Sequence, residues 1–258
     1  MIAVSIGLGL VIGALIGLLG GGGSILAVPA LVYLAGQDLQ QAVATSLVVV
    51  GITALVAVTP RMRAQQVSWR IGLLFGAAGA ATAFAGAAVN RLLPDAVTLA
   101  LFAVLMVGAG VRMLQEEPAI GTACAVDAGR VNWRRCLPRT MAGGLVVGFL
   151  TGLLGVGGGF LIIPVLVLAL GLPMGTAVGT SLLVVAINSA AGFLAHAGEA
   201  ALDVPVAAAF TAAAVLAALA AGRLGSRTDT DRIRRWFAWL VLGVAGLMAV
   251  EVLVDLLT

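Results

Sequence analysis

The chain has 258 residues, of which 62% are hydrophobic and 10% are charged, and its mean hydropathy is +1.17. A soluble chain of this length cannot cover that much apolar surface, so the composition excludes a soluble domain and predicts an all-α polytopic membrane protein. The formal net charge is +3. The basic residues are all arginine and lie in short loops between apolar runs, which indicates membrane topology and excludes a nucleic-acid partner.

The first apolar run, Ile2–Leu19, ends at four glycines, Gly20–Gly23. It lacks a basic leader region, and its glycine-rich end recurs later in the chain, so we expect mature structure rather than a signal peptide. The next run, Ile25–Ala35, would form roughly 16 Å of helix, about half of what a span requires. The segment therefore predicts a glycine-broken hairpin that enters the membrane and returns.

The same pattern is written twice. GLLGGGGSILAVPALVYLAG begins at Gly17, and GLLGVGGGFLIIPVLVLALG begins at Gly152, so the two copies keep one register (152 − 17 = 135) without a gap. Within a membrane protein, paired and interrupted apolar segments in corresponding halves point to a transport site. We expect a first transmembrane repeat over residues 1–115, a cytoplasmic linker over 116–138 and a second repeat over 139–258.

Arginine placement decides between two topologies. Eight full crossings would put the third arginine-bearing loop, 222–235, on the opposite side from loops 60–70 and 112–139. Two re-entrant hairpins and six crossings put all three on one side, as the excess of arginine in cytoplasmic loops requires. The sequence thus predicts two inverted repeats, each a re-entrant hairpin plus three transmembrane helices. The hairpins should open to opposite sides, near positions 38 and 172.

The glycine clusters are the candidate substrate site. Non-helical backbone inside a bilayer needs protein or a water-filled cavity to cover it, and helices starting there would direct free N–H groups at an anion. The alternative for glycine is close helix packing, and for the serine and threonine hydroxyls it is bonding to a carbonyl one turn earlier. The candidate substrate-binding residues are Gly20, Gly21, Gly22, Gly23, Thr45, Ser46, Gly155, Gly157, Gly158, Gly159, Thr180, Ser181 and Asn188.

No Asp, Glu or buried Arg is evident well inside an expected span. Transporters of cations and protons usually keep an intramembrane carboxylate, so its absence favours a small anion held by backbone donors and hydroxyls. His196, the single histidine, is either a proton relay or a solvated interfacial residue. Cys124 and Cys136 match no metal-binding spacing, and we expect free thiols in a loop. We expect no metal, no cofactor and no enzymatic activity.

The doubled motif resembles the sulfite exporter TauE/SafE family of membrane permeases. The matching stretches are Gly17–Leu31 with Ala42–Leu47, and Gly152–Leu166 with Ala177–Leu182. The resemblance implies secondary transport of sulfite, sulfoacetate or other organosulfonates, a multi-pass protein of the cell inner membrane, and a homodimer. The family's motif positions are matched by Gly20, Gly22, Gly23, Pro29, Thr45 and Ser46, and by Gly155, Gly157, Gly158, Pro164, Thr180 and Ser181.

Two other functions remain open at this point. An anion or small-solute channel would use the same broken segments. A membrane assembly factor or redox carrier would use the two cysteines. The substrate, the direction of transport, the coupling ion and the oligomeric state do not follow from the sequence.

Overall fold

A computed structural model describes most of the chain. The described residues are 2–34, 36–37, 39–90, 92, 101, 104–108, 110–111, 114, 124, 126–127, 130–131, 133–154, 159–196, 204–225, 232, 235–236, 238–239, 241–243 and 245–246. The candidate site residues Gly155, Gly157 and Gly158 lie outside them.

The described chain is helical apart from one two-stranded antiparallel pair, β1–β2, in the linker. In chain order the elements are α1 (Ile2–Leu19), the 3₁₀ helix η1 (Gly20–Leu26), α2 (Ala27–Pro29), the π-helix η2 (Ala30–Leu34), α3 (Leu39–Arg63), α4 (Trp69–Asn90), β1 (Val126–Asp127), β2 (Arg130–Val131), α6 (Trp133–Leu154), α7 (Gly159–Pro164), the π-helix η3 (Val165–Ala169), α8 (Met174–His196) and α9 (Val204–Gly225).

The segments after the glycine clusters differ from the single half-length helices that the sequence predicts. The first is a succession of three short pieces, η1, α2 and η2, with 3₁₀, α and π pitch. The helical segment after each glycine cluster changes to π pitch directly after its proline, Pro29 or Pro164. A proline has no N–H to continue the helical ladder, which gives a local reason for the change. The two π segments start at equivalent positions of the repeat (165 − 30 = 135).

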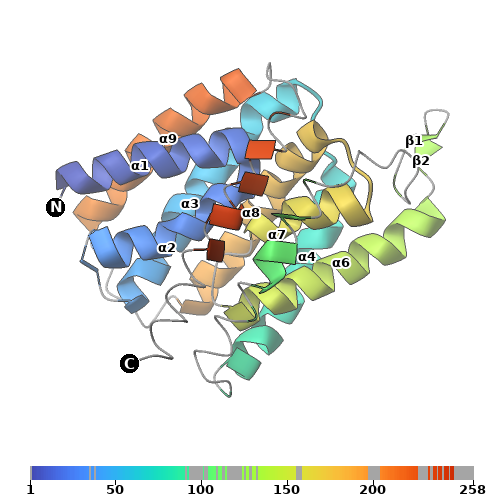
Figure 1. The fold of residues 1–258 in the computed structure, drawn as a ribbon, viewed down its shortest axis with the longest axis horizontal. Coiled ribbons are helices and arrows are strands. Elements are labelled where there is room, and N and C mark those ends of the chain that lie inside the picture. Colours follow the sequence, from blue (N-terminus) through green and yellow to red (C-terminus); the bar gives the residue numbers. More distant parts are fainter. Residues whose placement is uncertain are drawn as a thin grey trace.

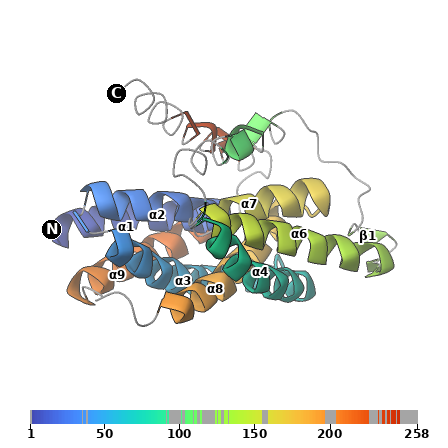
Figure 2. The ribbon, with the colours of Figure 1, turned by 90° about the horizontal axis from the view of Figure 1, so that it is seen from below.

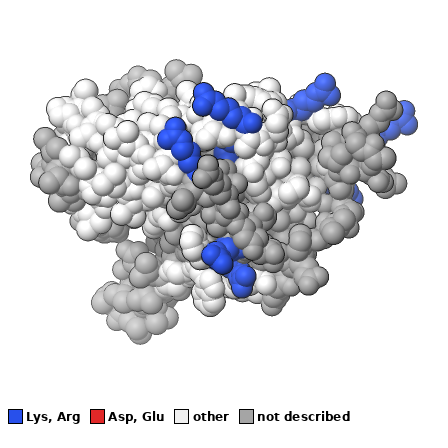
Figure 3. Space-filling model, turned by 90° about the horizontal axis from the view of Figure 1, so that it is seen from above, with Lys and Arg blue, Asp and Glu red and all other residues white. Residues whose placement is uncertain are grey.

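Several helices are long and apolar enough to cross a membrane. Four candidate spans occur among the described residues: Ala44–Arg63, Cys136–Leu153, Met174–Phe193 and Val204–Arg223. Large apolar side chains such as Leu10, Leu55 and Leu216 are exposed on α1, α3 and α9. Figure 3 shows a surface that is white over most of this face, with isolated blue basic groups and no red among the described residues. This is the surface expected of a chain whose solvent is largely lipid.

Helices α1 and α9 lie side by side, as do α4 and α6, while α3 packs against α8 between these pairs (Figure 1). In the view of Figure 2, α1 and α2 occupy one half of the molecule and α6 and α7 the other. In terms of the sequence repeats, α1, the first helix of the first repeat, packs against α9, the third long helix of the second repeat. In the same way, α6 of the second repeat packs against α4 of the first.

Glycine stripes make these contacts close. A Cβ built on any of six glycines would run into the backbone carbonyl oxygen of the facing helix. The pairs are Gly9 with Phe210, Gly13 with Ala214 and Gly17 with Ala218, and then Gly144 with Phe75, Gly148 with Gly79 and Gly152 with Ala83. Small residues at four-residue spacing are what lets membrane helices approach this closely. The two sets are related by the repeat. Gly9 is equivalent to Gly144 (144 − 9 = 135) and its partner Phe210 is equivalent to Phe75 (210 − 75 = 135), so each pair of the first set has an equivalent pair in the second.

Residues that flank the arginine-bearing loops make two contacts at one end of the bundle. A Cβ on Gly222, near the end of α9, would lie 3.7 Å from Cγ of Pro60, near the end of α3. Arg70, at the start of α4, places its guanidinium carbon 5.7 Å from the ring centroid of Trp133, at the start of α6. These contacts join the elements that flank all three loops.

The expectation of free thiols is wrong. Cys124 and Cys136 form a disulfide with an S–S distance of 2.07 Å. Both are buried, and the N–H of Cys124 donates to the carbonyl of Leu170 at 3.2 Å. The sequence could not show this, because a spacing of 12 residues fits a disulfide only if the backbone folds back, as it does at β1–β2.

Candidate functional site

The first glycine cluster turns the chain sharply at the end of α1. Gly20 adopts φ +68°, a left-handed conformation that costs glycine little and other residues more. The 3₁₀ helix η1 starts there, so the glycines are themselves helical and do not form a non-helical break before a new α-helix. Ser24 closes the turn, because its hydroxyl donates to the carbonyl of Gly21 at 2.6 Å.

The two glycine segments touch each other. A Cβ on Gly21 would lie 2.8 Å from both Cα and the carbonyl oxygen of Gly159, and 2.6 Å from Cγ2 of Val185. A Cβ on Gly159 would in turn meet the carbonyl oxygen of Gly21 and lie 2.7 Å from Oγ of Ser24. Only glycine at these positions allows the backbones of the two halves to come this close.

Ser181 of α8 lies beside this contact. Its hydroxyl accepts a long hydrogen bond, 3.5 Å, from the N–H of Gly21 and donates to the carbonyl of Val178 at 2.8 Å. A Cβ on Gly20 would be 2.6 Å from the same Oγ. Ser181 thus bonds back along its own helix, one of the two alternatives that the sequence leaves open, and its oxygen also faces the glycine segment.

The remaining candidate residues have different surroundings. Thr180 accepts a hydrogen bond from the N–H of Ser68 at 3.0 Å, so its hydroxyl anchors the turn between α3 and α4. Gly23 faces its own α1, where a Cβ would lie 2.8 Å from the N of Ile16. Gly22 lies in η1 between Gly21 and Gly23, and Ser46 is buried in α3.

Three buried side-chain oxygen atoms in α3 and α8 have no hydrogen-bond partner among the described residues: Oγ1 of Thr45, Oγ1 of Thr53 and Oδ1 of Asn188. Thr53 and Asn188 occupy the same position of the repeat (188 − 53 = 135). An unpaired buried polar atom costs about 1–3 kcal/mol, so each calls for a partner such as water or a ligand. The sequence predicts Thr45 and Asn188 as site residues; it pairs Thr53 with Asn188 through the repeat register but does not include Thr53 in the predicted site.

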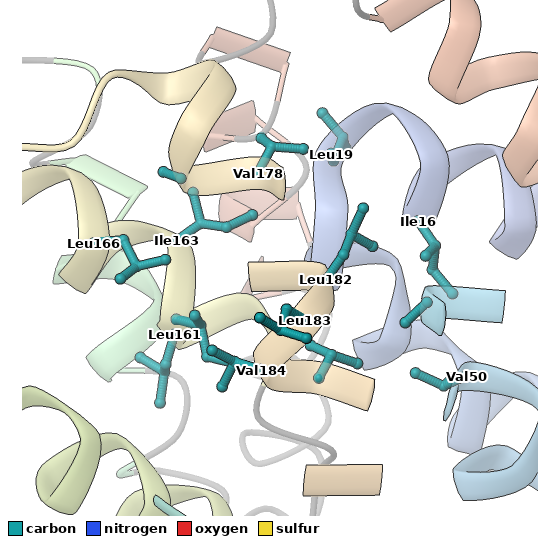
Figure 4. Close-up of a cluster of buried hydrophobic side chains, with 14 of the residues drawn as sticks. Ile16, Leu19, Val50, Leu161, Ile163, Leu166, Val178, Leu182, Leu183 and Val184 are labelled. Carbon is teal, nitrogen blue, oxygen red and sulfur yellow. The ribbon is translucent and has the colours of Figure 1, made fainter. Parts of the chain in front are cut away.

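Apolar side chains surround the glycine contact. Ile16 and Leu19 of α1, Ile163 of α7 and Leu182 of α8 belong to one buried cluster (Figure 4). A polar group in this environment has little access to water, which strengthens any hydrogen bond it makes to a ligand.

Arg61 corrects the expectation that no arginine is buried. The sequence places it in the loop at 60–70 because the charge-free apolar run ends at Thr59, yet α3 continues through Pro60 to Arg63. Arg61 is only 1% exposed. Its repeat position coincides with that of His196 (196 − 61 = 135), and this coincidence is the available signal that position 61 belongs to the helix.

No metal centre or catalytic constellation emerges from the part of the chain that the structure describes. No group of three or more His, Cys, Asp or Glu side chains there could hold a metal ion. No described helix contains an Asp or Glu residue. The polar groups that these helices offer to a ligand therefore include backbone amides, hydroxyls, carboxamides, guanidinium groups and the imidazole of His196, but no carboxylate.

The comparisons with known proteins agree with this picture. The family model for the sulfite exporter TauE/SafE matches residues 5–248. A probable membrane transporter protein of Xylella fastidiosa (strain 9a5c) is 33% identical over 245 residues, covering 94% of this chain and 92% of the relative. The probable membrane transporter protein YunE of Bacillus subtilis (strain 168) is 29% identical over 208 residues, covering 73% and 76%. No solved structure matches the chain.

Proposed function

Since the chain belongs to the sulfite exporter TauE/SafE family, a family of membrane transporters rather than enzymes, we propose that it is a secondary transporter of small sulfur-containing anions. Sulfite, sulfoacetate or another organosulfonate would bind between the two glycine segments and cross by alternating access. We place the protein in the cell inner membrane, and we carry the homodimer over from the family resemblance. The observation that carries the proposal is the contact between Gly21 and Gly159.

The repeated helix contacts support two inverted halves. Gly13 meets Ala214, and the equivalent positions of the repeat, Gly148 and Gly79, meet in the same way with the roles of the two halves exchanged. Exchange of this kind is what a twofold axis produces. If that axis lies in the membrane plane, rocking one half against the other opens the site to each side in turn.

The chemistry of the contact favours an anion. The N–H of Gly21 reaches Ser181 only through a long 3.5 Å bond, so the amide is available to a better acceptor. The unpaired hydroxyls of Thr45 and Thr53 in α3 can each donate to an anion, whereas the unpaired atom of Asn188 in α8 is the acceptor Oδ1, so only the amino group of that side chain would face an anion. Because the described helices carry no carboxylate, an anion meets no like charge on them.

Flux into proteoliposomes tests this function. We expect purified protein to carry radiolabelled sulfite or sulfoacetate above the rate of empty vesicles, and to accelerate uptake when unlabelled anion is loaded inside. Such counterflow distinguishes a carrier from a channel, because a channel gives flux without exchange. The absence of flux for every sulfur oxyanion tested would count against the proposed function.

The membrane orientation has a separate test. Arginine-rich loops favour the cytoplasm for the end that holds Arg70 and Trp133. Against this orientation stands the disulfide Cys124–Cys136, since disulfides are uncommon in the cytoplasm.

In a background with Cys124→Ser and Cys136→Ser, we expect Asp38→Cys to react with an impermeant maleimide in right-side-out vesicles. We expect Pro173→Cys, at an exposed position, to react only in inside-out vesicles. Labelling of both positions from one side would exclude the inverted arrangement, and the reverse pattern would invert the orientation.

A further inference from the structure

Arg61 is a cation in a place that normally excludes charge. It lies in α3 with 1% of its surface exposed. A guanidinium cannot lose its proton at ordinary pH, so it cannot avoid the cost of burial by becoming neutral. Buried arginines are therefore almost always matched with an acidic group or another strong acceptor.

The acceptors around Arg61 are neutral. Nη1 donates to Oε1 of Gln66 at 3.1 Å, and Nη2 reaches the carbonyl oxygens of Gly17 and Leu18 at 3.4 and 3.5 Å. N–H···O bonds usually measure about 2.7–3.2 Å, so both carbonyl contacts are long. Nε has no partner among the described residues. Among the described residues, the charge is compensated by the carboxamide of Gln66 and by the carbonyl dipoles at the end of α1, and part of its donor capacity is unused.

The guanidinium is linked to the glycine contact from two sides. Gly17 and Leu18 lie in the last turn of α1, directly before the turn at Gly20. On the other side, the carbonyl oxygen of Gln66 lies against Gly179, where a Cβ would collide with it. The next two residues of α8 are Thr180, which accepts a hydrogen bond from Ser68, and Ser181, which accepts one from Gly21.

We propose that Arg61 is a substrate-binding residue. It binds a small oxyanion beside the contact between Gly21 and Gly159, on the side that faces the arginine-bearing loops. The oxygens of the anion would replace the two long carbonyl contacts and engage the free Nε, giving the paired hydrogen bonds that guanidinium groups form with oxyanions. This inference rests on the proposed anion transport. The repeat puts His196 at the equivalent position (196 − 61 = 135), so each half ends its post-hairpin helix in a residue that can carry positive charge.

Sulfite transport by reconstituted full-length variants tests the proposal. We expect Arg61→Gln to raise the KM for sulfite about tenfold to a hundredfold, the loss that corresponds to removing a charge-assisted hydrogen bond. Arg61→Lys keeps the charge but loses the planar guanidinium with its paired N–H donors, so its KM should fall between those of Arg61→Gln and the wild type. The matched control is Arg63→Gln, because Arg63 ends the same helix but is exposed, and its KM should stay unchanged.

A readout on the unmutated protein covers the case in which Arg61→Gln does not fold. With arginine labelled with ¹⁵N, we expect the Nε–H resonance of Arg61, assigned by its loss in Arg61→Lys, to shift on titration with sulfite. An unchanged KM in Arg61→Gln, or equal losses in both Arg61 variants confined to the maximal rate, would reduce Arg61 to a cap for α1. If the wild type transports no sulfite, the proposed function fails. The titration with sulfite, sulfate and thiosulfate still decides whether Arg61 binds an anion. A shift of the Nε–H resonance supports anion binding by Arg61, and no shift with any of the three anions overturns it.

Discussion

Replacing Gly21 with alanine is expected to reduce sulfite transport by at least about tenfold. The added methyl would lie 2.8 Å from Cα and the carbonyl oxygen of Gly159 and 2.6 Å from Cγ2 of Val185, and real Cβ atoms do not approach that closely. Two of these three atoms are backbone, so the glycine segments must separate. Overpacking of this kind costs about 1–3 kcal/mol, and about 1.4 kcal/mol changes an affinity tenfold.

Two further variants make this result specific. Gly7 lies in the same first helix, and a Cβ there meets nothing within 4 Å, so Gly7→Ala should transport at the wild-type rate and be as stable or slightly more so. Adding Val185→Ala to Gly21→Ala removes the side-chain collision but not the two collisions with Gly159. Transport should therefore remain low in the double variant. Full recovery would show that crowding against α8, and not separation of the glycine segments, causes the loss.

Sequence reasoning predicts the long helices of this fold well, because uninterrupted apolar runs leave few alternatives in a membrane. The expected run Ala42–Thr59 lies within α3 (Leu39–Arg63), and Ala177–Ala195 lies within α8 (Met174–His196). Gly21 and Gly159 are among the predicted substrate-binding glycines, although neither is a position that the two copies of the motif share, and the structure brings them into contact. The apolar runs are local signals, so the helices are specified locally, whereas the contact between Gly21 and Gly159 joins distant parts of the chain.

The sequence-based expectations differ from the structure where a contact between distant parts of the chain determines the environment of a residue. The burial of Arg61 depends on α1 ending beside α3 and on α3 continuing past Pro60, and neither follows from the neighbouring sequence. The disulfide between Cys124 and Cys136 depends on a fold-back in the linker. The sequence predicts that Thr180 faces the substrate or bonds back along its own helix, but its hydroxyl binds the N–H of Ser68, which is distant in the chain.

The glycine stripes lead to the second major prediction: Gly13→Ala and Gly148→Ala should destabilise the protein to a similar extent. A Cβ on Gly13 would lie 2.7 Å from the carbonyl carbon of Ala214, and one on Gly148 would lie 2.5 Å from that of Gly79. Because backbone atoms are struck in both cases, no side-chain movement relieves the contact. Each variant should lose about 3 kcal/mol or more, at the upper end of overpacking costs. Thermal unfolding of the purified protein in detergent, followed by tryptophan fluorescence, measures the loss.

The comparison between the two variants tests more than packing. Gly13 joins α1 to α9 and Gly148 joins α6 to α4, so equal losses mean that the two cross-half interfaces are energetically equivalent, as a twofold relation between the halves requires. Gly7→Ala again serves as the control within α1 because its Cβ has open space. A large loss for one variant and none for the other would mean that the interfaces differ in strength. Rocking about a common axis would then lose its structural basis, since alternating access needs both interfaces to stay intact while the halves move.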